Sequence, residues 1–251
     1  ATLSELCKVQ ANPGEIHMEA MEHLLKYVCT TRRYGIMFGG RRRDIANGLL
    51  VGYVDSDWAG DPDTKYSRGG FVFTSRGAPI SWSSYKMKSV AASSAESEYC
   101  SASRSVREAK WLRYLFSDMG YGDLKTVQHG KFCDQDFARV QLSDLVDPKE
   151  QPILLMVDNK AAIAISKNPV LHKRSKHIHI AYHIVRREVA KKNVVMAYIP
   201  TNENIADMMT KSLKKNSQQH LADKILVQYD GKNYSDVKGK PLEPIDSTPL
   251  Q

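Results

Sequence analysis

Hydrophobic residues near the start of the chain recur at every fourth position, at Ile16, Ala20, Leu24 and Val28. Because a helical turn takes 3.6 residues, this spacing keeps them on one face, and Pro13 suits the first turn of a helix. The pattern predicts an amphipathic helix over residues 13–28. The polar stretch 39–43 contains two glycines and three arginines, which predicts a linker.

Three short runs typical of β-strands follow, at 49–55, 70–74 and 79–82. The polar segment 61–69 and a turn around Gly77 separate them. Connections this short favour strands that run antiparallel to their neighbours. We therefore expect a three-stranded antiparallel meander.

A long helix is predicted next, beginning after a serine N-cap at Ser93 or Ser94. Its buried face is marked by small and apolar residues one turn apart, at Ala102, Val106 and Ala109. Residues 123–151 are polar and show no period, so we expect a surface excursion there.

The second half of the chain alternates strands and helices. The run 153–157 is apolar at every position, as in a strand of a parallel sheet that is buried on both faces. Another strand is predicted at 194–199. Helices are predicted from Lys160, over 176–191 and over 203–213, and residues 216–251 are expected to form an irregular tail.

The order β-β-β-α-β-α-α-β-α indicates an α/β fold. The helical crossover after the meander makes the fourth strand parallel to the first, and its natural place is beside it. The expected architecture is a five-stranded mixed sheet in the order 3-2-1-4-5, flanked by helices. Because the order reverses between strands one and four, the crevice at their carboxyl ends is the expected site.

Four carboxylates are expected to converge on this crevice. Asp55 lies at the end of the first strand, and Asp158 comes directly after the fourth. In the long helix, Glu98 falls in register with the buried face, whereas Glu96 lies about 200° away from it. Asp207 belongs to the helix that follows the last strand.

Two other aspartates compete for these positions. Asp57 shares a strand face with Asp55 and can take its role. Asp134 is an alternative to Asp158, but it has no buried strand before it and no apolar helix after it. The choice between Asp55 and Asp57 stays open at this point.

Carboxylates placed this close together raise one another's pKa values unless cations neutralise them. Oxygen ligands suit Mg²⁺ or Mn²⁺ better than zinc. Two such ions roughly 3.5–4 Å apart can clamp an in-line phosphoryl displacement. The four acids therefore predict a nuclease.

Charge adds a second argument, because the 251 residues include 36 lysines and arginines against 28 aspartates and glutamates, a net charge of +8. Eight of these cations lie between residues 167 and 192, where Glu188 is the single acid. Such a run is either a solvated face or a surface that grips a nucleic-acid backbone, and its place beside the crevice favours the second. Nucleic-acid contacts are expected from Lys173, Arg174, Lys176, Arg186, Arg187 and Asn159.

A zinc site at His177, His179 and His183 is an alternative. His179 and His183 are one turn apart, but no H-E-x-x-H pattern or cysteine partner accompanies them, which favours phosphate contacts or helix packing. The four cysteines include no C-x-x-C pair, and no apolar run reaches the ~20 residues of a membrane span. We expect a soluble protein of a reducing, intracellular compartment.

Eight ordered stretches between residues 51 and 213 carry a family resemblance. They are V-G-Y-V-D-S-D-W-A-G-D (51–61), S-R-G-G-F-V-F (67–73), I-S-W-S-S-Y-K (80–86), V-A-A-S-S-A-E-S-E-Y (90–99), E-A-K-W-L-R (108–113), V-D-N-K-A-A-I (157–163), N-P-V-L-H-K-R-S-K-H-I-H-I (168–180) and A-D-M-M-T-K-S-L (206–213). In these stretches the chain resembles the ribonuclease H domain of copia-type (Pseudoviridae) retrotransposon polyproteins.

The resemblance implies a ribonuclease H fold and hydrolysis of the RNA strand of RNA–DNA hybrids during reverse transcription. It implies two Mg²⁺ ions, replaceable by Mn²⁺, as cofactors. The implied partners are the hybrid and the polymerase domain of the same polyprotein, in a cytoplasmic virus-like particle or in the nucleus. The metal ligands and catalytic residues carried over are Asp55, Glu98, Asp158 and Asp207.

The resemblance also implies a domain organisation. Residues 1–45 would be the C-terminal end of the reverse transcriptase, a thumb- or connection-like helix and linker, because 13–28 is similar to the segment that ends that enzyme. Residues 46–215 would be the ribonuclease H domain, and 216–251 the tail. Two departures stand out: residues 199–207 lack the histidine of many cellular ribonucleases H, and His179 replaces the family's aspartate in K-H-I-D.

Two other functions are alternatives to the nuclease. A non-catalytic nucleic-acid-binding or structural module of a reverse transcriptase would be marked by a lost carboxylate, and all four acids are present. A strand transferase of the integrase type needs its acids in the order D-D-E, whereas here they run D-E-D-D. The acids therefore favour the nuclease.

Overall fold

The computed structural model describes residues 2–38, 50–61, 63–75, 77–119, 152–167 and 179–228. Several of the expectations above lie outside these ranges: the linker at 39–43, the excursion at 123–151, Asp134, Lys173, Arg174, Lys176 and His177. No helix within the described ranges has the length and apolar character needed to cross a membrane.

A mixed sheet of five strands, in the order β4–β3–β2–β5–β6, forms the centre of the fold. The strands are β2 (Leu50–Asp57), β3 (Arg68–Ser75), β4 (Ala78–Lys86), β5 (Ile153–Val157) and β6 (Val194–Tyr198). The first three form an antiparallel meander, β5 runs parallel to β2, and β6 runs parallel to β5. The predicted α/β class and the predicted order 3-2-1-4-5 are both confirmed.

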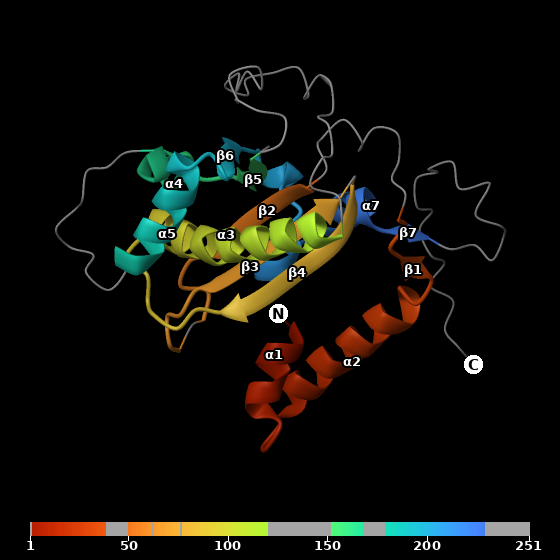
Figure 1. Ribbon diagram of the computed structural model, residues 1–251. Helices are drawn as coiled ribbons and strands as arrows, with labels where there is room; N and C mark the ends of the chain where they lie inside the picture. The colour runs from red at the N-terminus through yellow and green to blue at the C-terminus, as the bar shows by residue number, and fades with distance from the viewer. Residues whose placement is uncertain are drawn as a thin grey trace.

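Three helices pack on one face of this sheet: α3 (Ser94–Asp118), α4 (Lys160–Lys167) and α5 (His179–Ala190). Helix α3 begins after Ser93, whose side chain accepts a hydrogen bond from the Glu96 backbone, as the N-cap prediction requires. Figure 1 shows α3 lying along the sheet, with α4 and α5 at one end. The main core lies between these helices and the sheet, and includes Val54, Phe73, Tyr99, Val106, Leu155 and Val185.

The opposite face of the sheet is covered by α6 (Asp207–Thr210) and α7 (Lys215–Ile225). There Val72 of β3 packs with Ile205 and Leu221 in a smaller core. The prediction of an irregular tail over 216–251 is therefore wrong for its first part, which contains α7 and β7 (Val227–Gln228). The spacing of Leu221 and Ile225 by one turn gives α7 the apolar side that packs there.

The helix predicted over 203–213 is much shorter than expected. A 3₁₀ turn occupies Thr201–Glu203, and α6 has only four residues. Asn204 between them is fully buried; its side-chain amide donates to the Val54 carbonyl at 2.9 Å, and its side-chain oxygen accepts from the Ala206 N–H at 3.2 Å. The bond to the Val54 carbonyl holds the segment against β2. The segment stays a loop because the Asn204 side chain accepts from the Ala206 N–H, which a continuous helix would pair with a backbone carbonyl.

The N-terminal arm consists of α1 (Thr2–Leu6), a 3₁₀ turn at Cys7–Val9 and α2 (Glu15–Thr30). Helix α2 confirms the predicted amphipathic helix, yet none of its residues is buried. Two ion pairs connect the arm to the β2–β3 region: Glu5 with Arg68, and Lys8 with Asp61 at 2.8 Å. After α2, strand β1 (Tyr34–Gly35) pairs antiparallel with β7 (Figure 1).

Candidate metal centre

The parallel pairing of β2 and β5 brings Asp55 and Asp158 side by side. Val54 lies opposite Val157 in the register, so Asp55 and Asp158 take the next positions at the carboxyl ends of the two strands. Side chains alternate along a strand. Because Val54 and Val157 belong to the core under α3, the two aspartates face the other side of the sheet, toward α6.

Asp207 completes a group of three acids from the first turn of α6. It is buried, as is Asp55, whereas Asp158 is half-buried. One carboxylate oxygen from each of the three lies within 4.8 Å of the other two. Asp57 is not a member of this group, so the geometry favours Asp55 at this position.

Glu98 comes from α3, on the other face of the sheet, and is not a member of this group of three. It is 5% exposed and extends from the first part of α3, and its Oε1 accepts a hydrogen bond from the Ser56 backbone N–H at 3.1 Å. Its Oε2 is buried and has no hydrogen-bond partner among the described residues. Glu96 instead accepts from the Ala92 N–H at 3.1 Å, so the predicted choice of Glu98 as the inward acid is confirmed.

Burial and repulsion from neighbouring carboxylates raise the pKa values of Glu98, Asp158 and Asp207. Burial, and then the charges of Asp55 and Asp158, raise the pKa of Glu98 to about 9. Burial and the charge of Asp55 raise the pKa of Asp207 to about 7, and the same two causes raise the pKa of Asp158. Divalent cations would reverse these shifts, because they stabilise the ionised carboxylates.

Three polar residues that the sequence reasoning missed contact the acids. Thr210 donates its hydroxyl to Oδ2 of Asp55, and Thr201 donates to Oδ2 of Asp158 at 2.8 Å. Lys211 places its ammonium 3.0 Å from Oδ1 of Asp55 and 3.1 Å from Oδ1 of Asp207. Burial lowers the pKa of Lys211, but the two carboxylates outweigh it and raise that pKa overall.

The spacing between Asp207 and Lys211 in the sequence could have identified Lys211. It follows Asp207 by four residues, so the two side chains share a helical face if the helix reaches that far. Contact with Asp55 could not be read from this spacing, because it depends on how α6 packs across β2.

The predicted nucleic-acid contacts are only partly described. Asn159 accepts a hydrogen bond from the Ala162 N–H at 3.0 Å and so caps α4. Arg186 is half-buried on α5, and Arg187 is exposed beside it, 3.2 Å from the Glu188 carboxylate. The Glu188 side chain is only 1% exposed and also binds Lys110, so the single acid of the basic segment is turned inward.

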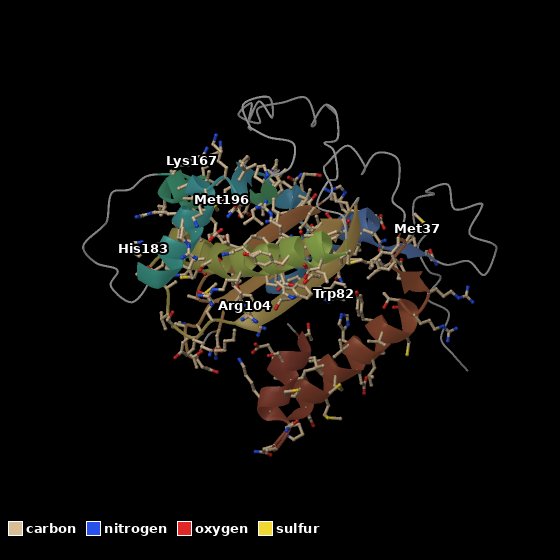
Figure 2. All side chains as sticks on the ribbon, viewed as in Figure 1. Met37, Trp82, Arg104, Lys167, His183 and Met196 are labelled. Atoms are coloured by element: carbon tan, nitrogen blue, oxygen red, sulfur yellow. The ribbon has the colours of Figure 1, made fainter. Side chains whose placement is uncertain are left out.

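The zinc alternative gains no support from the described histidine. His183 lies exposed on α5, at the same end of the molecule as Lys167 of α4 (Figure 2). The metal-capable group found among the described residues consists of aspartates alone. Oxygen-only ligands suit Mg²⁺ or Mn²⁺.

Comparison with known proteins places the chain in a family. It is 34% identical over 205 residues to the retrovirus-related Pol polyprotein from transposon TNT 1-94 of Nicotiana tabacum, covering 82% of this chain and 13% of that protein. It is 31% identical over 224 residues to the corresponding polyprotein from transposon RE1 of Arabidopsis thaliana, covering 89% of this chain and 13% of that protein. Over most of its length the chain is thus homologous to a segment of the Pol polyproteins of copia-type transposons.

The chain spans about an eighth of the length of the curated relatives that it matches. No protein-family model matches it. Among solved structures, LC11-RNase H1, isolated from compost, shares 15% identity with a TM-score of 0.40, covering 64% of this chain and 91% of that one. The five strands themselves have the order β4–β3–β2–β5–β6.

Proposed function

We propose that this Pol segment is the ribonuclease H domain of a retrotransposon reverse transcriptase and hydrolyses the RNA strand of RNA–DNA hybrids. The observation that carries the proposal is the convergence of Asp55, Asp158 and Asp207, from three elements far apart in sequence, on one place at the switch point of the sheet. Similarity to the Pol polyproteins supports it, because reverse transcription leaves RNA paired with new DNA.

The residues at this place fit divalent metal ions. Each of the three aspartates offers an oxygen within 4.8 Å of the other two, and Glu98 adds a buried oxygen that has no partner among the described residues. A carboxylate oxygen left without a partner in the interior is costly unless a cation or proton satisfies it. The donor set contains only oxygen, which is the set that Mg²⁺ and Mn²⁺ prefer.

Asp55, Glu98, Asp158 and Asp207 would together hold two such ions. Two bound ions would supply activation of a water and stabilisation of the leaving 3′-oxygen. The chain positions these acids by hydrogen bonds: Thr210 orients Asp55, Thr201 orients Asp158, and the Ser56 N–H orients Glu98.

The hybrid would be held by the basic segment around α5. Arg187 is exposed there, and Lys173, Arg174 and Lys176 belong to the same stretch of sequence. Contacts to phosphates position a duplex without reading its sequence, and the 2′-hydroxyls in the minor groove distinguish RNA from DNA. Asn159, next to Asp158, is proposed to contact the strand that is cut.

A labelled RNA–DNA hybrid tests this function directly. The full chain with Mg²⁺ is expected to cut the RNA strand, and EDTA is expected to stop the reaction. Asp158→Asn should abolish cleavage and leave the unfolding transition in place. Asp118→Asn, an exposed acid in the last turn of α3, is the matched control and should cut like the parent chain.

The outcomes separate the alternatives. Turnover by Asp158→Asn would remove the site assignment. If the parent chain binds the hybrid but leaves it uncut at every Mg²⁺ and Mn²⁺ concentration, the domain is a non-catalytic binding module of the polyprotein.

A further inference from the structure

The Lys211 ammonium lies between two of the clustered acids. Its Nζ is 3.0 Å from Oδ1 of Asp55 and 3.1 Å from Oδ1 of Asp207. The Asp55 side chain is fully buried, and the Lys211 side chain is 31% exposed. The described contacts thus place the singly charged ammonium of Lys211 on the same oxygens that would bind a divalent ion.

Lysine and metal ion compete for these oxygens. Mg²⁺ binds carboxylate oxygens at about 2.0–2.1 Å, so an ion on Oδ1 of Asp55 or of Asp207 would crowd the present position of the ammonium. The two positive charges also repel at this range, most strongly where burial excludes water. The ammonium and a fully liganded ion therefore cannot hold these two oxygens together.

The position of Lys211 in the chain allows it to leave. It is the first residue after α6, with extended backbone angles of φ −117° and ψ 154°, and residues 212–214 after it are in no helix or strand. Its long, flexible side chain already reaches water, so the ammonium can turn outward without moving α6.

The threonine contacts to the acids do not conflict with a metal ion. Thr210 and Thr201 donate to the Oδ2 atoms of Asp55 and Asp158, so the Oδ1 atoms are left for other partners. They would hold the two carboxylates in place while the occupant of the site changes. Lys211 therefore stands apart from the other described contacts of the site, because its contact must break when an ion is bound.

We propose that Lys211 is an internal counter-ion that occupies the place of one divalent ion in the metal-free protein and is displaced when that ion binds. The inference rests on the proposed function only in requiring a divalent-metal site at these acids. The lysine keeps Asp55 and Asp207 assembled when no metal is present. It also sets a higher metal concentration for loading than the acids alone would require.

Metal binding without nucleic acid tests the competition. Mn²⁺ is titrated into the full chain, and free Mn²⁺ is followed by electron paramagnetic resonance. Lys211→Gln and Lys211→Met are expected to lower the Mn²⁺ dissociation constant about tenfold, which corresponds to ~1.4 kcal/mol. The exposed Lys215→Gln removes the same charge four residues away and should leave the constant within about twofold of the parent value.

Chemical labelling of the parent chain gives an independent readout that needs no variant. An amine-reactive acylating reagent is applied with EDTA and then with saturating Mn²⁺, and the peptide that contains Lys211 is quantified by mass spectrometry. Displacement predicts that labelling of Lys211 rises severalfold on metal binding. Labelling of Lys215 should stay the same in both conditions.

The outcomes separate this inference from the metal site itself. If the parent chain binds Mn²⁺ while both Lys211 variants bind it equally or more weakly, and labelling does not rise, the counter-ion role is wrong and the metal site stands. If the parent chain shows no saturable Mn²⁺ binding, both the site and the inference fail.

Discussion

Glu98 on α3 accepts a 3.1 Å hydrogen bond from the backbone N–H of Ser56, the residue next to Asp55 on β2. This bond joins the helix to the carboxyl end of the strand and fixes one oxygen of Glu98. The other oxygen is buried without a described partner. Glu98 is thus protonated at neutral pH when no cation is bound, because burial and the charges of Asp55 and Asp158 raise its pKa to about 9.

The metal-free chain should lose stability as the pH rises. Burial and the charges of Asp55 and Asp158 raise the folded-state pKa of Glu98 from 4.5 to about 9, and Asp207 rises from 3.8 to about 7. Between these values the folded chain binds more protons than the unfolded chain. The contribution of these two acids to the free energy of unfolding therefore falls from about pH 4 to about pH 9. Urea unfolding in EDTA across this range measures the slope.

Two comparisons check the cause of this pH dependence. Glu98→Gln removes the acid whose pKa is raised furthest on folding. It should therefore make the free energy of unfolding nearly independent of pH above about pH 7. Saturating Mg²⁺ should flatten the parent curve as well, because it favours the ionised acids. A free energy of unfolding that increases with pH in EDTA would contradict the assignment.

Gly70 of β3 should be sensitive because α6 packs directly on it. A Cβ at this position would lie 2.6 Å from Cβ of Met209 and 2.8 Å from Cγ2 of Thr210. Gly70→Ala is expected to push α6 away from the sheet and to cost about 1–3 kcal/mol of unfolding free energy. It should also weaken Mn²⁺ binding, since Thr210 orients Asp55. Gly35→Ala, where a Cβ meets nothing within 4 Å, is the control.

Asn204 should matter more than its place in a loop suggests. Its side chain joins the Val54 carbonyl and the Ala206 N–H, and so fixes the approach to Asp207. Asn204→Ala is expected to lower the free energy of unfolding by about 1–3 kcal/mol, because both backbone groups lose a buried partner. The exposed Asn202→Ala should change it by less than about 0.5 kcal/mol. Equal effects in urea unfolding would show that the side-chain bonds of Asn204 are not the cause.

Glu188 is expected to support the fold rather than the chemistry. Its buried carboxylate accepts from Asn193 at 2.7 Å and from Lys110 of α3 at 3.1 Å. Glu188→Ala should reduce the free energy of unfolding by about 1–3 kcal/mol, since these donors lose their partner. Cleavage per folded molecule should be retained. The exposed Glu19→Ala on α2 is the control for the lost charge.

The sheet and its two central acids could be predicted because both follow from local rules. Short connections fixed the antiparallel meander, and one long crossover placed β5 beside β2. Once the two strands are parallel, Asp55 and Asp158 must meet at their carboxyl ends. Glu98 followed from helical periodicity, because its register with Ala102 and Val106 decides which way it points.

The far face of the sheet could not be predicted in the same way. Helix α6 is too short for periodicity to detect, and Asn204 interrupts it through bonds to a strand 150 residues away. Helix α7 has a weak apolar side, which packs against Val72. The sequence placed Val72 in a strand but did not indicate that a helix would pack on it. The contacts of Lys211 depend on this packing, so the sequence alone could not show that a lysine would enter the group of acids.

The pairing of β1 with β7 determines which truncated fragments of the protein keep the fold intact. Strand β1 lies before residue 46 and β7 after residue 215, so a fragment with the boundaries 46–215 discards both partners of this ladder and also α7, whose Leu221 packs against Val72. Such a trimmed piece would expose the underside of β3 next to α6. The shortest piece worth expressing for enzymology thus starts ahead of Tyr34 and continues at least to Gln228.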